Sequence, residues 1–197
     1  MIQFLRTLLG RAWTPLFKRT KEADDALSEK INWVAEAISD APEFARRACA
    51  AAKDIGQFEL AGMEAQIHLE SIPPRHLEKK FPGLGQWLTA RQFAIFEILF
   101  FVGSPALPFL KKVPFGPYDW SQGNAIEILC RIAAQDANQK EIVSFLSMAA
   151  PTIRHEALMY ALGPLKAHAS RDDAIRQVLD QLIMQPEFRE AYQELPV

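Results

Sequence analysis

The chain has 197 residues, of which 49% belong to the hydrophobic set and 23% are charged. This balance predicts a soluble domain and excludes disorder for most of the chain, because a compact protein of this length buries roughly 70% of the surface that its unfolded form exposes. The 22 lysines and arginines are nearly balanced by 24 acids, which disfavours a protein that binds nucleic acid through overall positive charge.

Thirteen prolines divide the sequence. Proline removes a backbone donor and clashes with the preceding helical turn, so we expect prolines to bound helices. The segments between them have helical rather than alternating periodicity, which predicts an all-α fold. The predicted helices span residues 2–19, 24–40, 43–71 with a break near Gly56 or Gly62, 85–103, 105–112, 119–135, 138–149, 151–168 and 171–185.

The first predicted helix, residues 2–19, is basic and amphipathic. Five basic residues and no acid precede Glu22, and seven acids with one base follow from there to Glu43. The pattern is typical of a helix that docks on its own protein, or of one that lies on a membrane surface. The apolar face of this helix consists of Ile2, Leu5, Leu9, Ala12 and Leu16.

Residues 81–117 are rich in proline, glycine and phenylalanine. Such clusters stop helices and fix the direction of the chain, whereas a flexible linker would be polar and rich in serine. We therefore expect a packed connector between an N-terminal lobe of irregular helices, residues 1–112, and a C-terminal lobe, residues 113–197, within one continuous domain.

The helix predicted at 119–135 begins with a capping-box pattern formed by Asp119 and Gln122. Its apolar residues sweep an arc of roughly 200°, so the helix needs neighbours on two sides. Glu127 and Arg131 are spaced i and i+4, and we expect an exposed ion pair worth only about 0.3–0.5 kcal/mol. The polar side chains expected to form an exposed ridge are Gln122, Asn124, Glu127 and Arg131.

The stretch Ile153-Arg154-His155-Glu156-Ala157-Leu158-Met159-Tyr160-Ala161-Leu162-Gly163 resembles the V-R-x-x-A-x-x-A-L-G core of the second helix of HEAT-type repeats. Residues 124–129 resemble the same motif less closely, and the resemblance covers about residues 113–185. It implies an α-α superhelix of antiparallel helix pairs that serves as a binding scaffold. It also implies a structural role for Arg154, with ligand binding as the alternative.

No motif indicates catalysis, a metal or a cofactor. Cys130, His155 and an acid such as Glu156 or Asp119 are the residue types of a thiol nucleophile with its base and orienting group. A cysteine within an apolar arc, however, favours a buried, inert thiol. The four histidines lack ligand spacing, and no glycine-rich phosphate loop is present. The two cysteines are too few for a disulfide framework, so we interpret them as reduced thiols in a cytoplasmic protein.

The most apolar run, residues 93–102, is interrupted by Glu97 and is shorter than the about 20 residues that a membrane span needs. We expect this carboxylate to reach solvent at the edge of the helix, because a buried unpaired carboxylate is costly. The alternative is that a cation holds it.

An aromatic pair, Tyr118 and Trp120, flanks the expected helix start. Tyrosine and tryptophan are enriched in interfaces, and a helix N-terminus offers free backbone N–H groups, so this is a candidate binding surface. The alternative is that Trp120 fills a gap between helix pairs. The candidate binding residues are Tyr118, Asp119, Trp120, Gln122, Asn124, Glu127, Arg131, Arg154 and His155.

These observations predict a HEAT-like scaffold that binds a protein partner, is not an enzyme, and is a monomer or weak dimer. One alternative is a helical-repeat protein that holds nucleic acid in a basic groove, which the overall charge disfavours. Another is a peripheral membrane protein anchored by residues 1–19. The basic groove would use Lys111, Lys112, Arg131, Arg154 and Lys166.

Overall fold

A computed structural model describes residues 24–116, 120–135 and 138–195. Over these ranges the regular elements are all helical and no strand occurs, which confirms the predicted all-α class. The predicted helix at 2–19 lies outside the described residues. The α-helices are residues 24–35, α2 Ala41–Ala52, α3 Gln57–Ile67, α4 Leu84–Val102, α5 Leu107–Leu110, α6 Ser121–Gln135, α7 Gln139–Ala149, α8 His155–Ala169, α9 Asp173–Leu182 and α10 Pro186–Gln193. Four 3-10 turns, η1 Arg75–Leu77, η2 Ser104–Ala106, η3 Val113–Phe115 and η4 Ala150–Thr152, connect them.

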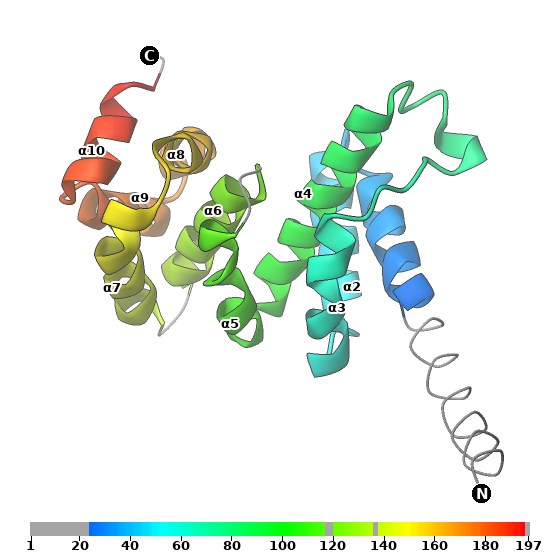
Figure 1. Cartoon of the computed structure of the whole chain (residues 1–197), viewed down its shortest axis with the longest axis horizontal. Coiled ribbons are helices and arrows are strands. Elements are labelled where there is room, and N and C mark those ends of the chain that lie inside the picture. Colours follow the sequence, from blue (N-terminus) through cyan, green and yellow to red (C-terminus); the bar gives the residue numbers. More distant parts are fainter. Residues whose placement is uncertain (1–23, 117–119, 136–137, 196–197) are drawn as a thin grey trace, which may run out of the picture.

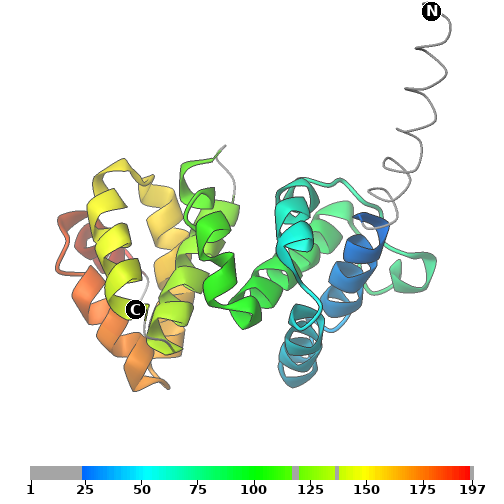
Figure 2. The ribbon, with the colours of Figure 1, turned by 90° about the horizontal axis from the view of Figure 1, so that it is seen from below.

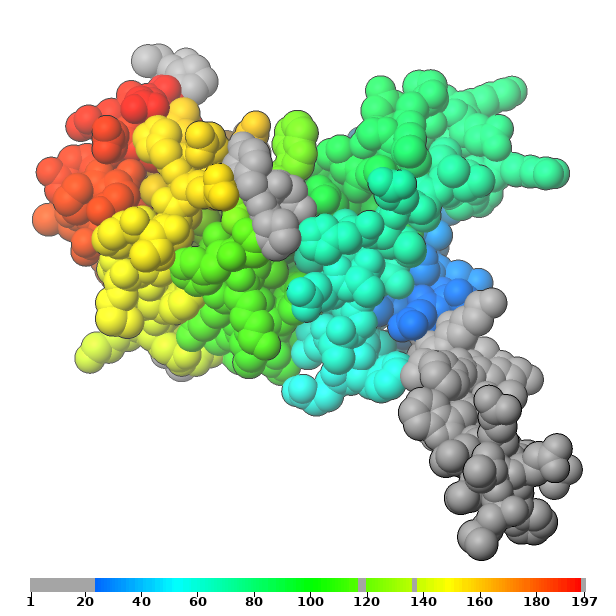
Figure 3. Space-filling view, in the orientation of Figure 1, coloured from blue at the N-terminus to red at the C-terminus, as the bar shows by residue number. Residues whose placement is uncertain are grey.

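The helices follow one another along the longest axis of the molecule (Figure 1). The helix of residues 24–35 lies with α2, α3 and α4 at one end, α7 to α10 lie at the other, and α5 and α6 lie between them. The turned view in Figure 2 and the surface in Figure 3 show the same progression. A single cluster of buried apolar side chains extends from Leu27 through α4 and α6 to Ala191.

Helix α6 lies at the centre of the packing, in contact with α4, α5, α7, α8 and α9. This confirms that its wide apolar arc has neighbours on more than one side. Gly123 allows the close crossing with α8, because a Cβ atom there would lie 2.6 Å from Tyr160 Cβ and 3.0 Å from the carbonyl oxygen of Ala157. No larger residue fits at this position unless the two helices move apart.

The predicted break near Gly56 is confirmed. Helix α2 ends at Ala52, and Gly56 is the N-cap of α3, where its N–H donates to Glu59 Oε2 at 2.9 Å. Asp40 caps α2 in the reverse sense, because its side chain accepts from the Glu43 N–H of the first turn at 3.2 Å. These caps satisfy first-turn donors that have no partner within the helix.

Two helix boundaries at prolines differ from the prediction. Pro186 begins α10, a helix absent from the prediction, which treats this proline only as a boundary; proline is well suited to the first helical turn. Pro164 lies inside α8, as it does in the predicted helix at 151–168, and the neighbouring elements hold the helix despite the missing backbone donor. Pro151 lies in η4, so α8 begins at His155 and not at 151.

A buried arginine joins three helices of the N-terminal half. Arg91 of α4 is 2% exposed and donates to Gln66 Oε1 of α3 at 2.8 Å, to Ser28 Oγ at 3.4 Å and to Asn32 Oδ1. Burial lowers the pKa of this guanidinium to about 10. Its neutral acceptors fix how α3 and the helix of residues 24–35 pack on α4.

Candidate binding groove

Of the aromatic pair predicted to bind a partner, the structure describes only Trp120. Tyr118 and Asp119 lie outside the described residues, so the expected capping box does as well. The side chain of Trp120 is 62% exposed, and its ring lies 5.5 Å from the ring of Tyr160, which is 47% exposed. The alternative that Trp120 fills a gap between helix pairs is therefore wrong.

The expected polar ridge on α6 is not exposed. Gln122 is 2% exposed and Glu127 is 8% exposed, because η3, α4 and α8 all pack around this helix. The Gln122 amide nitrogen donates to the carbonyl oxygens of Pro114 at 3.1 Å and Gly116 at 2.9 Å. Gln122 therefore holds the η3 turn against α6 instead of facing a partner.

Arg131 and Glu97 form a bidentate ion pair between α6 and α4. Arg131 Nη1 donates to Glu97 Oε2 at 2.8 Å and Nη2 donates to Oε1 at 2.9 Å, and each side chain is only 13% exposed. The guanidinium also lies 4.0 Å from the centre of the Phe100 ring. The expected pair of Glu127 and Arg131 is present, with Nη1 3.6 Å from Glu127 Oε1, but the expectation that it is exposed is wrong. The expectation that Glu97 reaches solvent is also wrong, and the alternative that a cation holds it is correct.

This ion pair lines a groove of about 410 Å³ that brings together helices of both halves of the chain. Phe93 and Phe96 of α4 and Phe44 of α2 form an apolar side, and Ile128 of α6 and Pro164 of α8 continue it. The volume lies within the range of about 300–1,000 Å³ found for ligand sites. The groove also contains the charged side chains of Glu97, Glu127, Arg131 and His168.

Glu127 is the least well paired of these charges. Its side chain is 10% exposed and shares the Arg131 guanidinium with Glu97. Its nearest cationic groups are Arg131 Nη1 at 3.6 Å, already bonded to Glu97, and His168 Nε2 at 3.4 Å, a side chain that is 44% exposed and charged only if protonated. Two carboxylates thus share one guanidinium, and a cation supplied by a ligand would compensate the second.

Three of the predicted site residues, Asn124, Glu127 and Arg131, line this groove. Arg154 and His155 do not. Arg154 is exposed at the N-cap of α8, and His155 Nε2 lies 2.8 Å from Glu194 Oε2, so that it joins α8 to the end of α10. The hydrogen bond to this carboxylate raises the pKa of His155.

Sequence reasoning missed Phe93 and His168 as site residues. Both belong to the groove only because α4, α6 and α8 cross at this point. The available signal was Glu97, a carboxylate within an apolar helix, which had to lie near a cation or near solvent.

The cysteine considered as a nucleophile lies in the core. Cys130 is 1% exposed, and burial together with the nearby Glu127 charge raises the pKa of its thiol, which opposes formation of the nucleophilic thiolate. In the same residues no group of three or more His, Cys, Asp or Glu side chains could hold a metal ion. Nor does any described helix have both the length and the apolar character needed to cross a membrane.

Comparisons of the chain with protein-family models, with curated proteins and with solved structures give no match. The groove is therefore interpreted from its geometry and charge.

Proposed function

We propose that this protein is a non-enzymatic, HEAT-like helical scaffold that binds a basic amphipathic segment of a protein partner in the groove. Apolar side chains of that segment pack on Phe44 and Phe93, and one lysine or arginine reaches Glu127. The observation that carries the proposal is the Glu127 carboxylate, which is mostly buried at an apolar groove and shares the single guanidinium of Arg131 with Glu97.

The packing of the C-terminal helices supports the scaffold part of the proposal. Helix α6 contacts α7, and α8 contacts α9, while α6 also contacts α8 and α7 contacts α9. Two stacked helix pairs have this pattern of contacts, and repeat scaffolds bind partners on the surfaces that such stacking creates. The resemblance of residues 153–163 to a HEAT helix is consistent with it.

The charges of the groove favour a basic segment over nucleic acid. Arg131 is bonded to Glu97, and Lys111 lies 2.5 Å from Glu141, so two of the cations considered for a phosphate-binding groove are paired with acids. The remaining carboxylate of Glu127 would repel a phosphate and attract an ammonium or guanidinium group.

Peptide binding tests the proposal directly. Fluorescence anisotropy should show that an amphipathic peptide of leucine and lysine binds, whereas its leucine and glutamate counterpart does not. Glu127→Gln should weaken binding about tenfold, because it removes one charge-assisted contact. Asp180→Asn is the matched control, since Asp180 is an exposed acid of α9 outside the groove. Equal binding by the Glu127→Gln and Asp180→Asn proteins would refute the assigned site.

Photo-crosslinking in cells tests the same surface with natural partners. A photoreactive phenylalanine analogue at position 93, where the side chain is 42% exposed, should capture a protein. The same analogue at position 58, on α3 and 55% exposed, serves as the control. Capture should decrease when Glu127→Gln is added at unchanged melting temperature. Capture that persists in that variant would contradict recognition through Glu127.

A further inference from the structure

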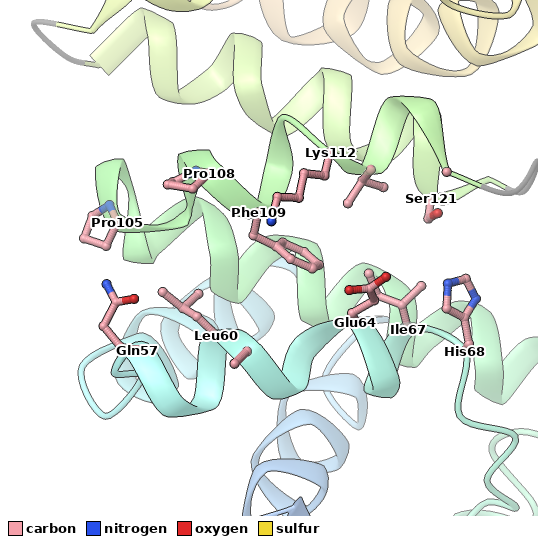
Figure 4. Close-up of a pocket in the computed structure, with 13 residues that line it drawn as sticks. Gln57, Leu60, Glu64, Ile67, His68, Pro105, Pro108, Phe109, Lys112 and Ser121 are labelled. Carbon is pink, nitrogen blue, oxygen red and sulfur yellow. The ribbon is translucent and has the colours of Figure 1, made fainter.

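A second cavity, of about 290 Å³, lies between α3 and the segment that runs from η2 to the start of α6 (Figure 4). It is separate from the groove and has no lining residue in common with it. Its volume is at the lower end of the about 300–1,000 Å³ of typical ligand sites, which restricts an occupant to a small molecule.

The apolar part of the cavity comes from both walls. Leu60 and Ile67 of α3 are each 7% exposed, and Phe109 and Val113 of the opposite wall are partly buried against the core. Figure 4 shows the ring of Phe109 above α3, between Leu60 and Ile67. An apolar group held here would lose contact with water on two sides.

Two opposite charges face this apolar region from the two walls. Glu64 extends from α3 and Lys112 from the segment after α5, and Figure 4 shows both side chains directed into the space between the walls. Neither forms a hydrogen bond or an ion pair with any described residue, whereas the neighbouring Lys111 is paired with Glu141. Both residues are exposed, and together they offer a ligand one carboxylate and one ammonium group at the cavity.

We infer that this cavity binds a small zwitterion with an apolar body, of the size of an apolar amino acid or dipeptide. The ligand's ammonium group lies at Glu64, its carboxylate lies at Lys112, and its apolar side chain packs between Leu60 and Phe109. Both ionic contacts are charge-assisted, and the apolar contact selects against polar side chains. This site is independent of the protein-binding groove.

Ligand-observed NMR with the intact protein tests this inference. The probes are L-leucine, L-phenylalanine and the dipeptide leucyl-leucine, each compared with its N-acetylated and C-amidated forms. At least one free zwitterion should bind, and blocking either of its charges should weaken binding about tenfold. Failure of all three probes, or equal binding of the blocked forms, would overturn the inference.

Matched variants place the binding in this cavity. Glu64→Gln and Lys112→Met should each reduce affinity about tenfold. Glu78→Gln and Lys53→Met remove the same charges from exposed positions that do not line the cavity. These control variants should bind the zwitterion with the same affinity as the original protein. Circular dichroism of each variant confirms folding. Equal effects of the cavity and control variants would mean that zwitterions bind elsewhere, which would overturn the assignment.

Discussion

Removal of Arg131 should destabilise the fold far more than removal of a surface charge. The change Arg131→Met keeps a long apolar side chain beside Phe100 but removes both hydrogen bonds to Glu97. It leaves Glu97 and Glu127, whose side chains are 13% and 10% exposed, without their shared guanidinium.

The magnitude follows from the burial of the pair. Breaking one partner of a fully buried ion pair costs about 3–5 kcal/mol, whereas an exposed pair is worth about 0–1 kcal/mol. Because Arg131 and Glu97 keep some contact with water, we expect the free energy of unfolding to fall by about 2–4 kcal/mol. For a chain of this length that corresponds to a decrease in melting temperature of roughly 5–15 °C.

Urea unfolding followed by far-ultraviolet circular dichroism measures this effect. The original protein, Arg131→Met, Glu97→Gln and the double variant form a double-mutant cycle, and we expect a coupling energy of about 1–3 kcal/mol between the two residues. If Arg131→Met changed the unfolding free energy by less than about 0.5 kcal/mol, the level of a surface substitution, the pair would not stabilise the contact of α4 with α6.

Three other experiments test separate parts of the structure. Gly123→Ala should lower the unfolding free energy by roughly 1–3 kcal/mol through overpacking, whereas Gly163→Ala, which meets nothing within 4 Å, should not; equal thermal stabilities would refute the close crossing of α6 with α8. In an NMR titration His155 should have a pKa above its ordinary value of about 6.5, and Glu194→Gln should lower that pKa. The His155–Glu194 pair therefore stabilises the fold fully at pH values below about 6.5, and this contribution is lost as the pH rises through the raised pKa. Cys130 should resist alkylation until the protein unfolds, whereas rapid modification of the native protein would show that the thiol is accessible.

The helical class and most helix positions could be predicted because they depend on local chemistry. Proline positions and helical periodicity are properties of short windows, and the break at Gly56 has a capping residue within the same window. The prediction failed at Pro186 because a proline can end one segment and begin the next, and only the packing of α10 against α8 decides between the two.

The faces of α6 were harder to predict because periodicity does not identify the neighbour that covers each face. The helix has a polar side, and isolated in water that side would be exposed. In the fold α4 crosses it, so Glu127 and Arg131 are largely buried. Glu97 and Arg131 are 34 positions apart in the sequence, and no short window contains both of them.

The unequal number of charges gives the groove a preference that an apolar groove would lack. If Arg131 and Glu97 were alone, each would satisfy the other, and an apolar pair of similar volume would stabilise the fold at least as well. Glu127 changes this balance, because it adds a second carboxylate while Arg131 remains bonded to Glu97 and His168 is only 3.4 Å away at the exposed side. A partner cation that binds here gains a charge-assisted contact, and a partner anion meets uncompensated negative charge. In the proposed complex, the second carboxylate would therefore select a basic partner.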